Sequence, residues 1–144
     1  MSDPLSIISA IVGILAAAGK VVEVLGPYVS AAKDTPQIAS SVHAEVFNSH
    51  IILRALHGLL DNLGTASSSR MTLIPIDDLI AIFTNGVLIF SELEESVLKI
   101  SQSGGDRFTV RMQWIRRKDD FTALLLRLQA FKSTIMCLLS ILQW

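Results

Sequence analysis

Apolar residues recur every three or four positions along most of the chain, and windows that alternate strictly between apolar and polar residues are nearly absent. This spacing is typical of amphipathic helices, so the sequence predicts an all-α fold. The first helix is expected to begin near Asp3 or Pro4, where an N-cap residue precedes a proline. It is expected to weaken at Gly26-Pro27, because proline cannot donate a helical hydrogen bond.

The rest of the chain divides into four further helical segments. The second helix is expected to start at residues 35–36, a Thr-Pro pair, and to continue to the loop "TASSSR". A third is expected from Pro75 or Asp77 to about Ser101. After the break "SQSGGD", the segment "RFTVRMQWIRRK" predicts a short helix, and the segment from Asp119 predicts a long one.

Each of the last three long helices carries one stripe of bulky apolar side chains that can face a common core. The stripes are Ile38, Val42, Val46, Leu53, Leu56, Leu60 and Leu63; then Leu79, Phe83, Phe90, Leu93, Val97 and Ile100; then Phe121, Leu124, Leu128, Phe131, Ile135, Leu138 and Leu142. These stripes predict a helical bundle of four long helices plus one shorter helix, with a hydrophobic N-terminal helix. Residues 1–144 are expected to form a single domain, excised from a longer protein, and the family resemblance described below implies that it is the N-terminal part.

The composition narrows the range of partners. Hydrophobic residues make up 51% of the chain and charged residues 17%, and the net charge is −1. No long run of one sign occurs, so no nucleic-acid partner is expected. The single cysteine, Cys137, cannot form an internal disulfide, which favours a reducing compartment. Its apolar surroundings in "IMCLLSIL" predict a small buried hydrophobe rather than a reactive thiol.

Motifs that carry chemistry are missing from the sequence. It contains no phosphate-binding glycine loop and no HExxH, GxSxG, CxxC or DxDxDG pattern, so we expect no enzyme, no cofactor and no small-molecule substrate. The most suggestive group is His43, His50 and His57, which follow one another at intervals of seven residues. Seven helical residues rise about 10.5 Å, which is too far for the three rings to share one metal ion. We expect them to flank the apolar stripe, with a joint response to pH as the alternative.

The charged clusters also have simple structural interpretations. The carboxylates of Asp77/Asp78, Glu92/Glu94/Glu95 and Asp119/Asp120 are expected to cap helices or to lie on solvated faces. The basic group Arg111, Arg116, Arg117 and Lys118 is expected to be a solvated helix end. Contact of this basic group with phosphate headgroups is the alternative.

The most unusual stretch is "PLSIISAIVGILAAAG", residues 4–19, which contains no charged side chain. On a helical wheel one half is bulky, with Leu5, Ile7, Ile8, Ile11, Val12, Ile14 and Leu15. The opposite half is small rather than charged, and Ser9, Gly13 and Ala17 form a ladder of the kind that lets helix backbones approach closely. We expect this ladder to suit a tight helix neighbour in the resting bundle. If the helix leaves the bundle, the ladder could instead suit another copy of itself.

Two locations for this helix follow from its two apolar halves: the centre of the bundle, enclosed by the other helices, or a bilayer. Burying the seven bulky side chains is worth on the order of 10–20 kcal/mol, and lipid tails offer nearly the same surroundings as a protein core. Sixteen residues span about 24 Å, less than the roughly 30 Å of a hydrocarbon core. A full span would also draw Lys20 and Glu23 inward, so a permanent single span is not expected.

Three segments of the chain resemble a known family. They are the opening "DPLSIISAIVGILAAAGKV", the segment "HAEVFNSHIILRALHGLL", and "QWIRRKDDFTALLLRLQAFKSTIMCLLSIL", which contains Trp114, Lys118 and Lys132. Together they are similar to the HeLo-like N-terminal domain of fungal NLR-type STAND proteins. The resemblance covers nearly the whole chain, and its most specific parts are the opening and closing patterns.

This resemblance implies a cell-death effector bundle, cytoplasmic at rest, whose partners on activation are membrane lipids of the plasma membrane and other copies of the domain. Oligomerisation would release the N-terminal helix into the membrane. The inserting residues would be those from Leu5 to Leu15, with Gly13 and Gly19 permitting close helix contacts and Glu23 at the mouth of the opening. The alternative is a non-lytic oligomerisation or adaptor module.

Overall fold

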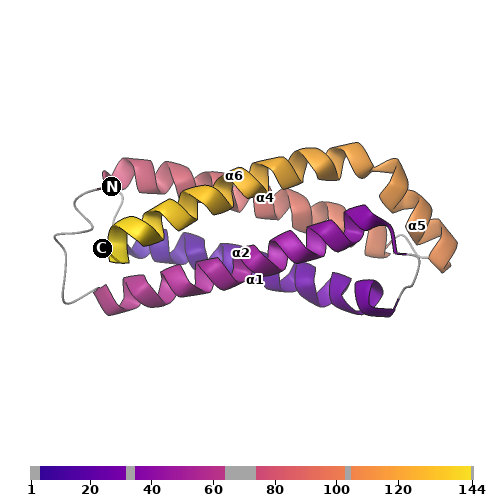
Figure 1. The fold of residues 1–144 in the computed structure, drawn as a ribbon, viewed down its shortest axis with the longest axis horizontal. Helices are drawn as coiled ribbons and strands as arrows, with labels where there is room; N and C mark the ends of the chain where they lie inside the picture. The colour runs from indigo at the N-terminus through magenta and orange to yellow at the C-terminus, as the bar shows by residue number, and fades with distance from the viewer. Residues whose placement is uncertain (1–3, 32–34, 64–73, 103–104, 144) are drawn as a thin grey trace.

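The computed structural model describes residues 4–31, 35–63, 74–102 and 105–143, and these segments are mainly helical. The helices in chain order are α1 (Pro4–Ala31), α2 (Gln37–Leu63), α4 (Ile76–Gln102), α5 (Arg107–Arg116) and α6 (Lys118–Gln143). The four long helices form one elongated bundle, and the short helix α5 lies at one end of it (Figure 1). The predicted all-α bundle of four long helices and one shorter helix is therefore confirmed.

The order of the helices around the bundle differs from their order in the chain. Helix α1 packs against α2 and α4, and α6 packs against the same two helices. Helices α1 and α4 run in one direction along the bundle, and α2 and α6 run in the other (Figure 1). Helices α1 and α6 therefore occupy opposite corners of the bundle. Helices α2 and α4 occupy the other two corners, and each of them contacts both α1 and α6.

The three predicted apolar stripes form most of a single core. Every residue of the stripes on α4 and α6 is buried. On α2, Ile38 and Leu60 are half-buried at the edge of the core, and the side chain of Leu63 lies outside the described residues. The remaining stripe residues on α2 are buried: Val42, Val46, Leu53 and Leu56.

The prediction that the first helix weakens at Gly26-Pro27 is wrong. Helix α1 continues through Pro27 to Ala31. Pro27 lies on the exposed face of α1, so the carbonyl that loses its helical partner there can be hydrated instead. Leu25 is buried and Tyr28 packs against the core, and these contacts favour a continuous helix on both sides of the proline.

The placement of α1 at the centre of the bundle, one of the two locations expected from the sequence, is also wrong. Helix α1 stands at a corner, and one of its faces is open to solvent. The reason is geometric, because four long helices of similar length bury each other's apolar stripes most completely in a square arrangement without a central member.

Gly86 of α4 lies where three helices approach one another. A Cβ atom added there would lie 2.6 Å from Cζ of Phe131 on α6 and 2.9 Å from Cδ1 of Ile14 on α1. Phe131 is itself fixed in an edge-to-face contact with Phe90, with ring centroids 6.2 Å apart. At this point of close approach the small residue is thus a glycine of α4, whereas Gly13 and Gly19 of α1 face open space.

Gly86→Ala is expected to lower the free energy of unfolding by about 1–2 kcal/mol. Overpacking a core costs about 1–3 kcal/mol, and alanine recovers at most about 1 kcal/mol in helix propensity. Urea denaturation measures the change. Gly13→Ala is the matched control, because an added Cβ at Gly13 meets no atom within 4 Å. Equal stabilisation by both substitutions would contradict the packing described for Gly86.

Helix α5 is joined to the bundle through an aromatic pair. Asp106 caps its N-terminus by accepting a hydrogen bond of 2.9 Å from the backbone N–H of Thr109, and this bond lowers the pKa of the Asp106 carboxyl. Trp114 on the inner face of α5 is buried and stacks on Phe121 of α6, with ring centroids 4.5 Å apart. Trp114 therefore connects the short helix to the core.

Cys137 corrects a further expectation. It is a free, exposed thiol on α6 and not a buried hydrophobe. Ile135 and Leu138 point into the core, and successive helical residues are rotated by about 100°, so the position between them turns outward. The apolar neighbours of Cys137 in the sequence indicated a buried segment, but they do not bury this residue.

Candidate functional site

The candidate site is the exposed face of α1. Between its start and Gly19 this face contains no charge and is lined by Ser9, Val12, Gly13 and Ala16, all of which are exposed. Val12 retains 50% of its surface accessible to solvent. A helix on the surface of a soluble bundle normally presents charged residues there, so the outer face of α1 is unusually apolar.

The residues predicted to insert into a membrane are divided between the core and the surface. Ile7, Ile11 and Ile14 are buried against α2 and α4. Ile8 and Leu15 are half-buried at the sides of the helix, and Val12 faces outward. The side chain of Leu5 lies outside the described residues. Most of this predicted set is thus buried or half-buried in the bundle. The insertion of these residues into a membrane stays a prediction.

The small residues of α1 do not mediate a tight contact in the resting bundle, contrary to one of the two expectations for them. Added Cβ atoms at Gly13 and Gly19 would meet no neighbour within 4 Å. Ser9 is exposed, and Ala17 packs at the edge of the core. The ladder turns outward because the larger isoleucines fill the space toward α2 and α4. Its contact with another copy stays a prediction.

Only two residues of α1 carry a charge, Lys20 and Glu23. Both are exposed on the same outer face as Val12 and Ala16. The outer face therefore changes from apolar to charged about midway along the helix. Glu23, predicted to lie at the mouth of an opening, is accessible to solvent in the resting bundle.

Helix α1 is attached differently from the other long helices. Counting the described residues only, no side chain between residues 7 and 27 makes a hydrogen bond or an ion pair with another helix. This segment of α1 is held by apolar contacts alone. Such contacts are non-directional, and lipid tails can replace them.

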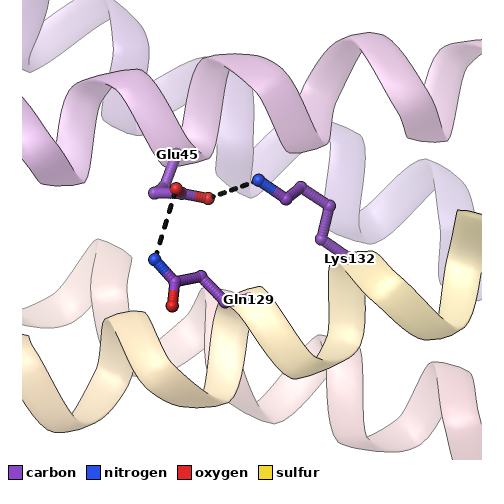
Figure 2. Close-up of polar contacts among 3 residues, drawn as sticks. All are labelled: Glu45, Gln129 and Lys132. Atoms are coloured by element: carbon purple, nitrogen blue, oxygen red, sulfur yellow. Dashed lines mark hydrogen bonds and ion pairs between the residues drawn. The ribbon is translucent and has the colours of Figure 1, made fainter.

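Polar contacts instead join α6 to both of the long helices that it packs against. Nζ of Lys132 on α6 donates to Oε2 of Glu45 on α2 at 2.8 Å, and Nε2 of Gln129 lies 3.4 Å from Oε1 of the same carboxylate (Figure 2). Arg127 on α6 pairs with Glu92 on α4. Helices α2, α4 and α6 are therefore linked by ion pairs into a unit, and residues 7–27 of α1 take no part in these pairs.

Lys132→Met is expected to destabilise the fold more than Arg127→Met. The Lys132 and Glu45 side chains are each only 21% exposed, so removing the lysine leaves a half-buried carboxylate with a single weak partner. We expect a loss of about 1–2 kcal/mol, against less than about 1 kcal/mol at the exposed Arg127 pair. Thermal unfolding of the two variants measures the difference, and equal losses would show that the Glu45 contact is not special.

The three histidines do not share a metal site in the described part of the chain. His43 stacks on Phe47, and Nδ1 of His57 lies 3.7 Å from a carboxylate oxygen of Asp61 on the same helix. Burial, followed by the charge of Arg54, lowers the pKa of His50. Within the part of the chain that the structure describes, no three histidine, cysteine or acidic side chains are grouped to hold a metal ion.

The sequence pattern predicts neither the role of Glu45 nor that the last helix, like the first, is long and apolar enough to cross a membrane. Glu45 lies in a polar stretch of α2 without any motif, and only the fold brings it to Lys132, 87 residues away. Two described helical segments are long and apolar enough to cross a membrane by length and composition: Ile7–Ser30 and Lys118–Gln143. In each, 28% of the most apolar window is buried in the bundle. Core helices of soluble proteins can pass the same test, so this property alone does not identify a membrane protein.

Comparison of the chain with protein-family models, curated proteins and solved structures gives no match. The fold defines a class, the four-helix bundle with a short accessory helix. This architecture is shared by proteins of many functions, so the class does not itself specify what the protein does.

Proposed function

We propose that the chain is a membrane-permeabilising cell-death execution domain that rests as a cytoplasmic bundle and is activated by oligomerisation at the plasma membrane. The observation that carries the proposal is the attachment of α1. Residues 7–27 are held to the bundle by apolar contacts alone, whereas α2, α4 and α6 are joined by ion pairs. Activation releases α1 and leaves the other three helices together.

The length of α1 supports insertion of the released helix. The apolar segment Ile7–Ser30 contains 24 residues, which correspond to about 36 Å of helix and exceed the roughly 30 Å of a hydrocarbon core. The sixteen uncharged residues that end at Gly19 span only about 24 Å, because the apolar segment continues for another eleven residues. Lys20 and Glu23 lie inside the longer segment, and charges at such depth favour a shared, water-lined interior over a lone helix in lipid.

Release of α1 has a cost that explains the requirement for clustering. Departure of the helix uncovers apolar residues of α2 and α4 that it had covered, so an isolated molecule keeps α1 in place. When several copies are brought together, these uncovered faces can pack on one another, and the outer ladder of Ser9, Gly13 and Ala17 can pack between inserted helices. Clustering thereby lowers the free-energy cost of release.

The test is release of a trapped dye from lipid vesicles by the protein after forced clustering through a fused dimerising module. Clustered protein is expected to release the dye, and the unclustered protein to leave the vesicles intact. Intact vesicles at every degree of clustering would overturn the proposal.

A second candidate is a non-lytic oligomerisation or adaptor module. Phe47 and Ile51, one turn apart on α2, expose 47% and 51% of their surfaces, as expected for a face that binds another protein. This function predicts that Phe47→Asp abolishes association of the domain while clustered protein never permeabilises vesicles.

A further inference from the structure

Helix α5 presents a largely exposed apolar stripe, and Ile115 at one edge of this stripe also lines a hollow shared with Ile38 of α2 and Leu125 of α6. Phe108, Met112 and Ile115 expose 67%, 38% and 47% of their surfaces. At about 100° per residue they fall within an arc of about 60°, on the side of the helix opposite the inward-facing Val110 and Trp114. Three large apolar side chains on one outward stripe, in a helix of only ten residues, indicate a surface that meets an apolar environment.

Positive charge surrounds this stripe. Arg111 and Arg116 flank it at about 60° and 80° from Phe108, and Arg107 lies further round on the side of Arg111. Arg117 and Lys118 follow directly, and no acidic residue occurs from 107 to 118. The whole chain has a net charge of −1, so the chain outside this segment, which holds five cations, carries −6. With the adjoining Asp106, Asp119 and Asp120 included, residues 106–120 carry +2 and the rest of the chain carries −3, so α5 and its borders are net positive in an otherwise acidic chain.

Arg107 and Arg116 are available to an external anion. Neither Arg107 nor Arg116 is in an ion pair with any carboxylate in the described part of the chain. Both side chains are exposed, and an arginine beside an apolar stripe can lay its methylene groups along that stripe and extend its guanidinium group outward.

We infer that α5 is a peripheral membrane anchor that docks the folded bundle on an anionic lipid bilayer. Phe108, Met112 and Ile115 enter the boundary between headgroups and acyl chains, and Arg107 and Arg116 contact lipid phosphates. A protein surface without negative charge would cover the apolar stripe but would leave Arg107 and Arg116 unpaired, and failure to bind anionic vesicles would point to a protein partner instead. The basic group of α5, expected from the sequence to be a solvated helix end, is on this inference part of a surface that binds anionic lipid.

This inference rests on the proposed membrane function only in that the target is a bilayer. Docking uses the folded bundle and needs neither clustering nor release of α1. Binding and permeabilisation can therefore be measured separately, and each can fail while the other holds.

The experiment is sedimentation of the unclustered chain with two kinds of vesicles, one of phosphatidylcholine and one of equal parts phosphatidylcholine and phosphatidylserine. The wild-type chain is expected to sediment mainly with the anionic vesicles. Arg107→Gln with Arg116→Gln is expected to weaken this binding about 25-fold, since each cation near an anionic surface contributes about fivefold. Phe108→Ser with Met112→Ser is expected to weaken it by at least a similar factor.

Matched controls carry the same changes elsewhere on the surface. Arg54→Gln with Arg127→Gln removes two exposed cations, and Leu88→Ser with Leu126→Ser removes two exposed apolar side chains. Both controls are expected to bind anionic vesicles within a few-fold of the wild type. Circular dichroism establishes that each variant is folded before binding is compared. Equal binding of the wild type to both kinds of vesicles, or equal losses in the α5 variants and the controls, would overturn the inference.

Discussion

Val12→Glu is expected to abolish dye release from vesicles by the clustered protein while leaving the resting bundle folded. Val12 is half exposed on the outer face of α1, so a glutamate there remains hydrated before activation. After insertion the same carboxylate would lie in hydrocarbon, where one ionised side chain costs about 2.5–3.5 kcal/mol. This cost reduces insertion of one helix by about 100-fold, and it applies to every copy in an oligomer.

Leu88→Glu on α4 is the matched control for this experiment. Leu88 is 56% exposed and belongs to the unit of three helices that stays together, so the same apolar-to-acidic change is expected to leave dye release unchanged. Glutamate at Ile11 would be a poorer test, because Ile11 is fully buried and its replacement would unfold the bundle. Dye release by Val12→Glu at the wild-type rate would remove α1 from the mechanism.

Trp114→Ala is expected to lower the free energy of unfolding by about 3–5 kcal/mol, the range typical of large aromatic residues in a core. Trp114 is 1% exposed, and its ring is the main contact between α5 and Phe121. The space left by the indole would join a hollow of about 180 Å³ already lined by Tyr28, Val97 and Trp114 itself. Partial collapse of α5 into this space would bring the loss toward the lower end of the range.

Ile115→Ala provides the comparison for Trp114→Ala within the same helix. Ile115 is adjacent in sequence but 47% exposed, so its truncation is expected to change stability by less than about 0.5 kcal/mol. Urea denaturation of both variants measures the difference. A small loss for Trp114→Ala would mean that α5 is not held through its indole ring.

The helices were predictable because their stripes repeat with the helical period. All of the stripe residues on α4 and α6 are buried, and the long helices begin within two residues of the expected positions. The continuation of α1 through Pro27 was not predictable from local preference. It depends on the exposure of Pro27 and on the packing of Leu25 and Tyr28, which are properties of the assembled bundle.

The candidate site could be predicted only in part. The absence of charge in the first half of α1 is visible in the sequence, but a helical wheel does not state which half faces the core. The bulky half faces inward, so the small residues at Ser9 and Gly13 are open. The pair of Lys132 with Glu45 joins residues far apart in the chain, and the exposure of Cys137 depends on the rotation of α6. These features are set by tertiary packing.

The position of α5 relative to the two ends of α1 separates capture from insertion in space. The N-terminus of α1 lies at the end of the bundle away from α5, whereas its C-terminal end lies near α5 (Figure 1). Helix α1 is about 42 Å long, so a bundle standing on α5 would hold the first turn of α1 that far above the lipid. To reach the bilayer, α1 would then have to rotate about its C-terminal end. Binding to the vesicle would be fast and reversible. Permeabilisation would follow after a lag, which is the time that α1 needs to rotate.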